Sequence, residues 1–145
     1  MTDLHYSKQI NAPREKVWDV LLDDATYREW TSVFMPGSYY QGDWSEGSKM
    51  LFLGPAAEGE KEGGMVALVK ENRSQEFISL EHHAEMRNGI EVPMESSGFE
   101  NYTLQDKDGG TEVSIDLLHL PDEYAGMFNE AWPKALEKIK ELAEK

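Results

Sequence analysis

The sequence predicts one α+β domain, in which an antiparallel sheet is covered by helices that lie toward the two ends of the chain. Three observations support this prediction. The chain has 145 residues, which is close to the commonest size of a single domain. Its middle part alternates apolar and polar residues with period two, as strands do. Its last part repeats apolar residues at steps of three and four, as amphipathic helices do.

The beginning of the chain predicts one strand followed by two short helices. Apolar and polar residues alternate from Leu4 to Ile10, which is typical of a half-buried strand. Pro13 then opens a helix, because proline is favoured at the first helical position. Asp23 or Asp24 is the expected cap of the second short helix, and residues 31–38 are expected to form a loop.

The middle of the chain predicts six strands joined by turns. They are expected over residues 38–43, 49–53, 65–70, 77–86, 98–105 and 112–119. Asp108-Gly109-Gly110 is a strong hairpin signal. The Gly-rich acidic run 54–64 predicts a mobile loop, and Gly89 and Pro93 predict that residues 88–95 interrupt the sheet. Because no helix separates consecutive strands, we expect antiparallel pairing.

A long amphipathic helix is predicted after Pro121. Its apolar residues are Phe128, Ala131, Trp132, Ala135, Leu136, Ile139 and Leu142. Pro133 lies inside this helix and should kink it, because proline removes one backbone hydrogen bond. Since the sequence contains no repeat and no low-complexity linker, residues 1–145 are expected to form a single domain.

Charge and missing residue types argue against several classes of function. The formal net charge is −14, and the chain has no cysteine. Nucleic-acid binding is not expected, because it requires a basic surface. No apolar stretch is long enough to span a bilayer, and no secretory signal is visible. We therefore expect a cytoplasmic monomer without metal or cofactor; an acidic surface that binds a basic partner protein is the alternative.

Short motifs occur along the whole chain. They are Ile10-Asn11-Ala12-Pro13, Val17-Trp18, Trp30, Gly42-Asp43-Trp44, Glu46-Gly47, Gly54-Pro55, Glu100-Asn101-Tyr102-Thr103, Gly110-Thr111 and Trp132-Pro133-Lys134-Ala135-Leu136. This set of motifs resembles that of the START-like (SRPBCC) superfamily. Within the superfamily, the chain is most similar to bacterial proteins that resemble the C-terminal domain of the activator of the ninety-kilodalton heat-shock chaperone's ATPase. The resemblance implies a helix-grip fold, in which a curved antiparallel sheet wraps around the long C-terminal helix and leaves an apolar cavity between them.

The resemblance implies three classes of function. Related folds bind lipids or other small apolar molecules, some catalyse cyclisation or hydrolysis, and one branch activates a chaperone. Fold alone does not choose among these. Non-enzymatic binding of a small hydrophobic or lipid-like molecule is our first expectation. The alternatives are a protein-interaction module that exposes Trp44 or Phe34, and a cyclase- or hydrolase-type enzyme that uses His82, Glu100 or His119.

Four polar side chains share the expected inner face of the sheet with apolar neighbours. His82, Glu100, Tyr102 and His119 follow the same alternation as the apolar residues of their strands, which places them on the cavity wall. A His–Glu pair in a dry pocket can act as general acid and base, whereas hydrogen-bonded wall residues are the alternative. His82 and His83 point to opposite faces of a strand, which argues against a shared metal ion.

Large side chains supply the expected apolar lining. Ordinary core packing is the alternative, since aromatic residues at helical spacing usually belong to the core. The fold implied by the resemblance favours a tunnel between the short helices and the long helix. The full set of expected ligand-binding residues is Trp30, Phe34, His82, Met86, Glu100, Tyr102, His119, Phe128 and Trp132.

Overall fold

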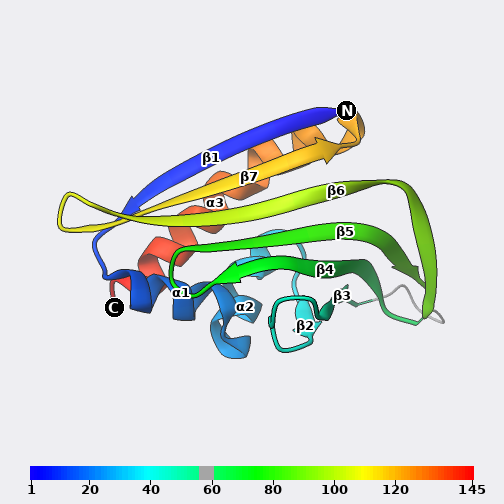
Figure 1. Ribbon diagram of the computed structural model, residues 1–145, viewed down its shortest axis with the longest axis horizontal. Helices are drawn as coiled ribbons and strands as arrows, with labels where there is room; N and C mark the ends of the chain where they lie inside the picture. Colours follow the sequence, from blue (N-terminus) through cyan, green and yellow to red (C-terminus); the bar gives the residue numbers. More distant parts are fainter. Residues whose placement is uncertain (56–60) are drawn as a thin grey trace.

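The structure, a computed structural model, describes residues 1–55 and 61–145. A seven-stranded sheet lies over one long helix, and two short helices lie beside the C-terminal end of that helix (Figure 1). In chain order the elements are β1 (Thr2–Ile10), α1 (Arg14–Leu22), α2 (Asp24–Trp30), η1 (Thr31–Val33), β2 (Tyr39–Gln41), β3 (Lys49–Gly54), β4 (Gly63–Arg73), β5 (Phe77–Arg87), β6 (Ile90–Lys107), β7 (Gly110–Leu120), η2 (Asp122–Tyr124) and α3 (Ala125–Ala143).

The strands from β2 to β7 form a meander, and the first strand, β1, is added beside β7 at one edge. The order of the sheet is β1-β7-β6-β5-β4-β3-β2, and every neighbouring pair is antiparallel. β1 and β2 are therefore the two edges, and α3 crosses one face of the sheet (Figure 1). This arrangement confirms the predicted α+β fold of the helix-grip kind.

Two hairpin turns consist of residues with positive φ. Asp108 and Gly109 have φ angles of 51° and 80° between β6 and β7, as the Asp-Gly signal predicts. Asn88 and Gly89 have φ angles of 49° and 77° between β5 and β6. Positive φ at both central residues is the mark of a type I′ turn, whose twist matches the twist of paired strands.

The predicted interruption of the sheet over residues 88–95 is wrong. β6 begins at Ile90 and continues through Pro93, because the turn before it reverses the chain directly. A proline inside a sheet requires an edge or a bulge. The register supplies a bulge, since His82 pairs with Gly98 whereas Ala84 pairs with Pro93, so that β6 carries extra residues at this point.

The helices lie where the sequence predicts them. α1 begins directly after Pro13, and Asp23 occupies the position before α2, although its side chain makes no capping hydrogen bond. α3 continues through Pro133. Of the loop expected over 54–64, residues 56–60 lie outside the described residues.

The start of β4 approaches β3 too closely for a side chain at Gly64. Gly64 has a φ angle of +155°, and a Cβ atom there would lie 1.8 Å from the carbonyl oxygen of Phe52. At Gly63 a Cβ atom would lie 3.0 Å from the carbonyl oxygen of Met86. Because both obstacles are backbone atoms within a sheet, neither can move aside at low cost.

Replacement of Ile139 by Asp tests the packing of α3 on the sheet. Ile139 is fully buried, so the new charge has no partner and should lower the free energy of unfolding by about 4 kcal/mol. Lys134→Asp on the exposed face of the same helix is the control and should cost less than about 1 kcal/mol. Equal losses in urea denaturation of the two variants would show that the helix does not bury this face.

Replacement of Gly64 by Ala tests the close approach of β3 and β4. The clash with backbone should lower the free energy of unfolding by about 3 kcal/mol. Gly126→Ala is the matched control, since a Cβ atom at Gly126 meets nothing within 4 Å. Because alanine suits a helix better than glycine, this control should stay unchanged or gain up to about 1 kcal/mol. Thermal melts of both variants measure these changes. A Gly64→Ala variant as stable as the parent protein would contradict the close approach of β3 and β4 at Gly64.

Candidate functional site

A cavity of about 730 Å³ lies between the inner face of the sheet and the helices. Its wall comes from α1, α2 and η1, from strands β3 to β6, and from the first half of α3. Protein interiors leave few voids larger than a water molecule, whereas ligand pockets measure roughly 300–1,000 Å³. The volume is therefore that of a ligand pocket and not of a packing defect.

Aromatic rings form much of the wall on the helix side. The ring centroid of Trp132 lies 5.1 Å from that of Phe34 and 5.8 Å from that of Trp30. Phe34 in turn lies 6.2 Å from Phe128, edge to face. Such aromatic pairs each contribute about 0.5–1.5 kcal/mol beyond the burial of their area. The rings therefore hold one another in place, and this part of the wall is preformed.

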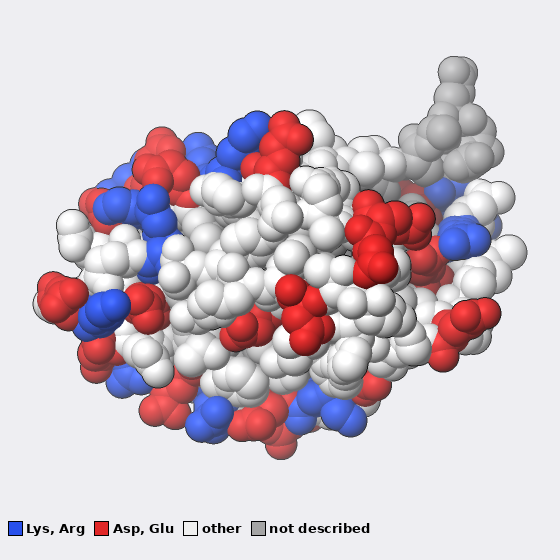
Figure 2. Space-filling model, turned by 90° about the horizontal axis from the view of Figure 1, so that it is seen from above, with Lys and Arg blue, Asp and Glu red and all other residues white. Residues whose placement is uncertain are grey.

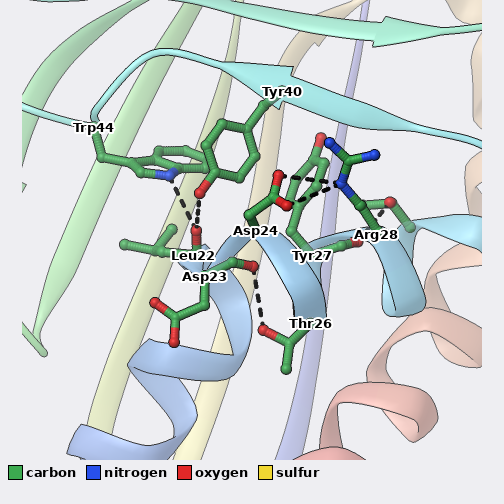
Figure 3. Close-up of polar contacts among 9 residues, drawn as sticks. Leu22, Asp23, Asp24, Thr26, Tyr27, Arg28, Tyr40 and Trp44 are labelled. Atoms are coloured by element: carbon green, nitrogen blue, oxygen red, sulfur yellow. Dashed lines mark hydrogen bonds and ion pairs between the residues drawn. The ribbon is translucent and has the colours of Figure 1, made fainter.

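Part of the wall rests on the junction between α1 and α2 (Figure 3). α1 ends at Leu22 because Asp23 has an extended backbone, with φ of −66° and ψ of 141°. The Leu22 carbonyl oxygen accepts hydrogen bonds from the Tyr40 hydroxyl at 2.5 Å and from Trp44 Nε1 at 3.2 Å. The last carbonyl groups of a helix have no partner within it, so these two side chains satisfy the helix end and fix the lining residues Leu22 and Trp44.

The alternative of a protein-interaction module requires Trp44 or Phe34 to be exposed, and Trp44 is not. The residue is only 9% exposed, because its indole N–H finds an acceptor inside the molecule and its ring packs against other rings. The ring centroids of Tyr40 and Phe52 lie 4.9 Å and 5.6 Å away. Phe34 is half-buried on the cavity wall. The two aromatic residues expected at a protein-binding surface thus both belong to the cavity.

The mouth of the cavity is marked by lining residues that are also exposed. Met35 and Met127 are 48% and 50% exposed, and the side chains of Lys61 and Arg87 are exposed beside them. The unbranched thioether side chain of methionine adapts to irregular shapes. The mouth can therefore adjust to the molecule that passes through it.

Three polar side chains on β5 and β6 meet on the cavity wall. His82 Nε2 lies 3.3 Å from Glu100 Oε1, and the Tyr102 hydroxyl donates a hydrogen bond to Glu100 Oε2. Pairing of β5 with β6 sets Leu80 opposite Glu100 and Ile78 opposite Tyr102. Alternate residues of each strand therefore share the inner face, as the sequence predicts.

The Glu100 carboxylate also affects the pKa of a tyrosine on the helix side of the cavity. Burial raises the pKa of the Tyr27 phenol, and the negative charge of Glu100 raises this pKa further, because a nearby anion disfavours a phenolate. Tyr27 therefore stays a neutral phenol. A histidine and a carboxylate in contact can hold or pass a proton beside a bound molecule; catalysis by His82 and Glu100 remains a prediction.

Eight of the nine residues expected to bind ligand line the cavity, and His119 does not. His119 is exposed, and its ring lies 6.5 Å from that of Phe99. Thr2 pairs with Leu120 whereas Leu4 pairs with Leu117, so β7 holds an extra residue here. This bulge, in which His119 has a φ of 58°, breaks the alternation from which an inward His119 was predicted. The eight residues on the wall are Trp30, Phe34, His82, Met86, Glu100, Tyr102, Phe128 and Trp132.

The sequence did not single out several other lining residues. Among them are Tyr27, Thr31, Met35, Phe52, Met65 and Met127. Phe52 and Met65 are paired in the register of β3 with β4, so the alternation in both strands was a usable signal for them. Met35 lies between η1 and β2, where no periodic pattern indicates the direction of its side chain.

Surface charge is spread over the molecule. Figure 2 shows acidic side chains distributed around the face that it displays. Within residues 1–55 and 61–145, no helix has both the length and the apolar character that crossing a membrane requires. In the same ranges, no three His, Asp or Glu side chains gather in a way that could hold a metal ion.

Comparison with known proteins agrees with the geometry. Among solved structures, protein CV1439 from Chromobacterium violaceum has a TM-score of 0.75 and 20% sequence identity, covering 100% of this chain and 99% of its own. Protein NE0264 from Nitrosomonas europaea has a TM-score of 0.74 and 14% identity, covering 98% and 94%. MLL2253 from Mesorhizobium loti has a TM-score of 0.72 and 16% identity, covering 99% and 97%. At these identities the likeness shows a shared fold alone.

The sequence itself matches one family over nearly its full length. No curated protein matches the chain. The family model described as "Activator of Hsp90 ATPase homolog 1-like protein" matches residues 11–144, which include every cavity element from α1 to α3. The chain therefore belongs to the family of Activator of Hsp90 ATPase homolog 1-like proteins, within the START-like superfamily.

Proposed function

We propose that this protein binds a small, mostly apolar molecule in the cavity between the sheet and α3. The observation that carries the proposal is the cavity of about 730 Å³ with its largely aromatic and thioether lining. An apolar wall in contact with water costs free energy, and a ligand that covers it recovers roughly 25 cal/mol per Å². Because the rings pack on one another, the aromatic wall does not need a ligand in order to form.

The lining residues have two roles in this proposal. The aromatic and methionine side chains provide contact area, which drives binding. The polar side chains of His82, Glu100 and Tyr102 orient the bound molecule and select among ligands of similar size. We expect the protein to act as a monomer, because a net charge of −14 opposes self-association. The absence of cysteine suits the reducing cytoplasm, where we expect it to act.

A chaperone-directed role, which the description of the family suggests, has weaker support. Such a role calls for an exposed anchor residue at an interface. The aromatic residue expected to supply it, Trp44, is buried and hydrogen-bonded to the end of α1. A binding cavity accounts for the same aromatic residues without a partner protein.

Replacement of Met65 by Trp tests the cavity directly. Met65 lines the cavity from β4, and the larger side chain should fill part of the volume. Titration with N-phenyl-1-naphthylamine, an uncharged fluorescent probe, should give binding to the parent protein. The variant should bind about tenfold more weakly, which corresponds to about 1.4 kcal/mol.

Met94→Trp is the matched control for this experiment. Met94 lies on β6 and does not line the cavity, so the same change of side chain should leave probe affinity unaltered. A saturating ligand should also raise stability, by about 2.7 kcal/mol at a concentration of 100 times Kd. Absence of probe binding to the parent protein, or equal binding by both variants, would count against the proposal.

A further inference from the structure

Glu100 brings a negative charge into a largely apolar wall. Among the described lining residues it is the sole acid. His82 and the Tyr102 hydroxyl contact one carboxylate oxygen each, whereas a carboxylate offers about four acceptor sites. The Glu100 side chain keeps 24% of its surface exposed. Because the residue lines the cavity, this surface is available to a donor on a bound molecule.

The ion pair of Glu100 is with His82, whose ring carries a positive charge only when it is protonated. In the described part of the chain, no Lys or Arg pairs with Glu100. Its charge also raises the pKa of Tyr27 on α2, another residue that lines the cavity. A partly buried charge is costly unless a partner compensates it. A ligand with a positive charge would supply this compensation.

Aromatic rings lie close to the two residues that contact the Glu100 carboxylate. The ring centroid of Phe52 lies 5.8 Å from that of His82, and the ring centroid of Trp132 lies 6.1 Å from that of Tyr102. A cation within about 6 Å of a ring face is attracted to it. A cavity lined by one carboxylate and several aromatic rings is thus a combination that suits ammonium and quaternary ammonium groups.

The Lys and Arg side chains among the described lining residues lie at the exposed side of the cavity. Both Lys61 and Arg87 are exposed at the mouth. The guanidinium group of Arg87 is paired with Glu85, through contacts of 2.7 Å and 2.6 Å. Glu100 lies near the middle of the sheet, opposite Leu117 on β7. The net charge of −14 further favours the approach of cations.

We infer that the ligand is an amphipathic amine or quaternary ammonium compound, whose cationic nitrogen lies at Glu100 and whose apolar body lies against the aromatic wall. The inference rests on the proposed function and adds the chemical class of the head group. It makes Glu100 the residue that determines specificity, with Tyr102 and His82 holding its carboxylate in position.

Three compounds that share a decyl chain test the inference on the full chain. Decyltrimethylammonium, decanol and decyl sulfate are titrated below their micellar concentrations by isothermal calorimetry. We expect the cation to bind about tenfold more tightly than the alcohol. Glu100→Gln should lower affinity for the cation about tenfold and change affinity for the alcohol less than about twofold.

Glu95→Gln is the matched control, because it removes the same charge from an exposed position on β6 outside the cavity. It should leave all affinities within about twofold. Equal affinity of the parent protein for the three compounds overturns the inference, and so does an equal effect of the two variants on the cation. Both results leave the proposed function standing, whereas a protein that binds none of the compounds refutes the function as well. The comparison of head groups in the parent protein holds even where Glu100→Gln fails to fold.

Discussion

The packing of one side chain, Trp132, ties the long helix to the rest of the molecule. Its ring lies 6.4 Å from Tyr6 on β1, 6.1 Å from Tyr102 on β6, 5.8 Å from Trp30 on α2 and 5.1 Å from Phe34 after η1. These rings come from two strands, from α2 and from the segment after η1, so α3 cannot slide or rotate without losing contacts to the sheet and to the short helices together.

The order of elements could be predicted because periodicity and turn chemistry are local properties. Asp108-Gly109 has the positive φ angles that its residues favour, and the hairpin forms there as expected. Asn88-Gly89 uses the same chemistry, yet Pro93 so soon after it indicated a break. The bulge that accommodates Pro93 depends on the partner strand β5. Information of this kind is not contained in the sequence of a single strand.

The same distinction explains which parts of the site could be predicted. His82 and Glu100 lie on the wall because regular alternation holds in their segments, whereas a bulge turns His119 outward. The burial of Trp44 could not be predicted, because its environment arises from the end of α1, many residues earlier in the chain. The contact between His82 and Glu100 requires the register of β5 with β6, which periodicity alone does not specify.

The pair Gly63-Gly64 leaves one stretch of the cavity wall without side chains. Any Cβ atom there would meet the backbone of Phe52 or Met86, so no substitution at these two positions can narrow the cavity while the strands stay paired. Descendants of this sequence can therefore change the size and shape of the accepted molecule only at the lining positions that carry side chains. Evolution of ligand choice is thereby directed away from the start of β4, which serves as a fixed reference surface.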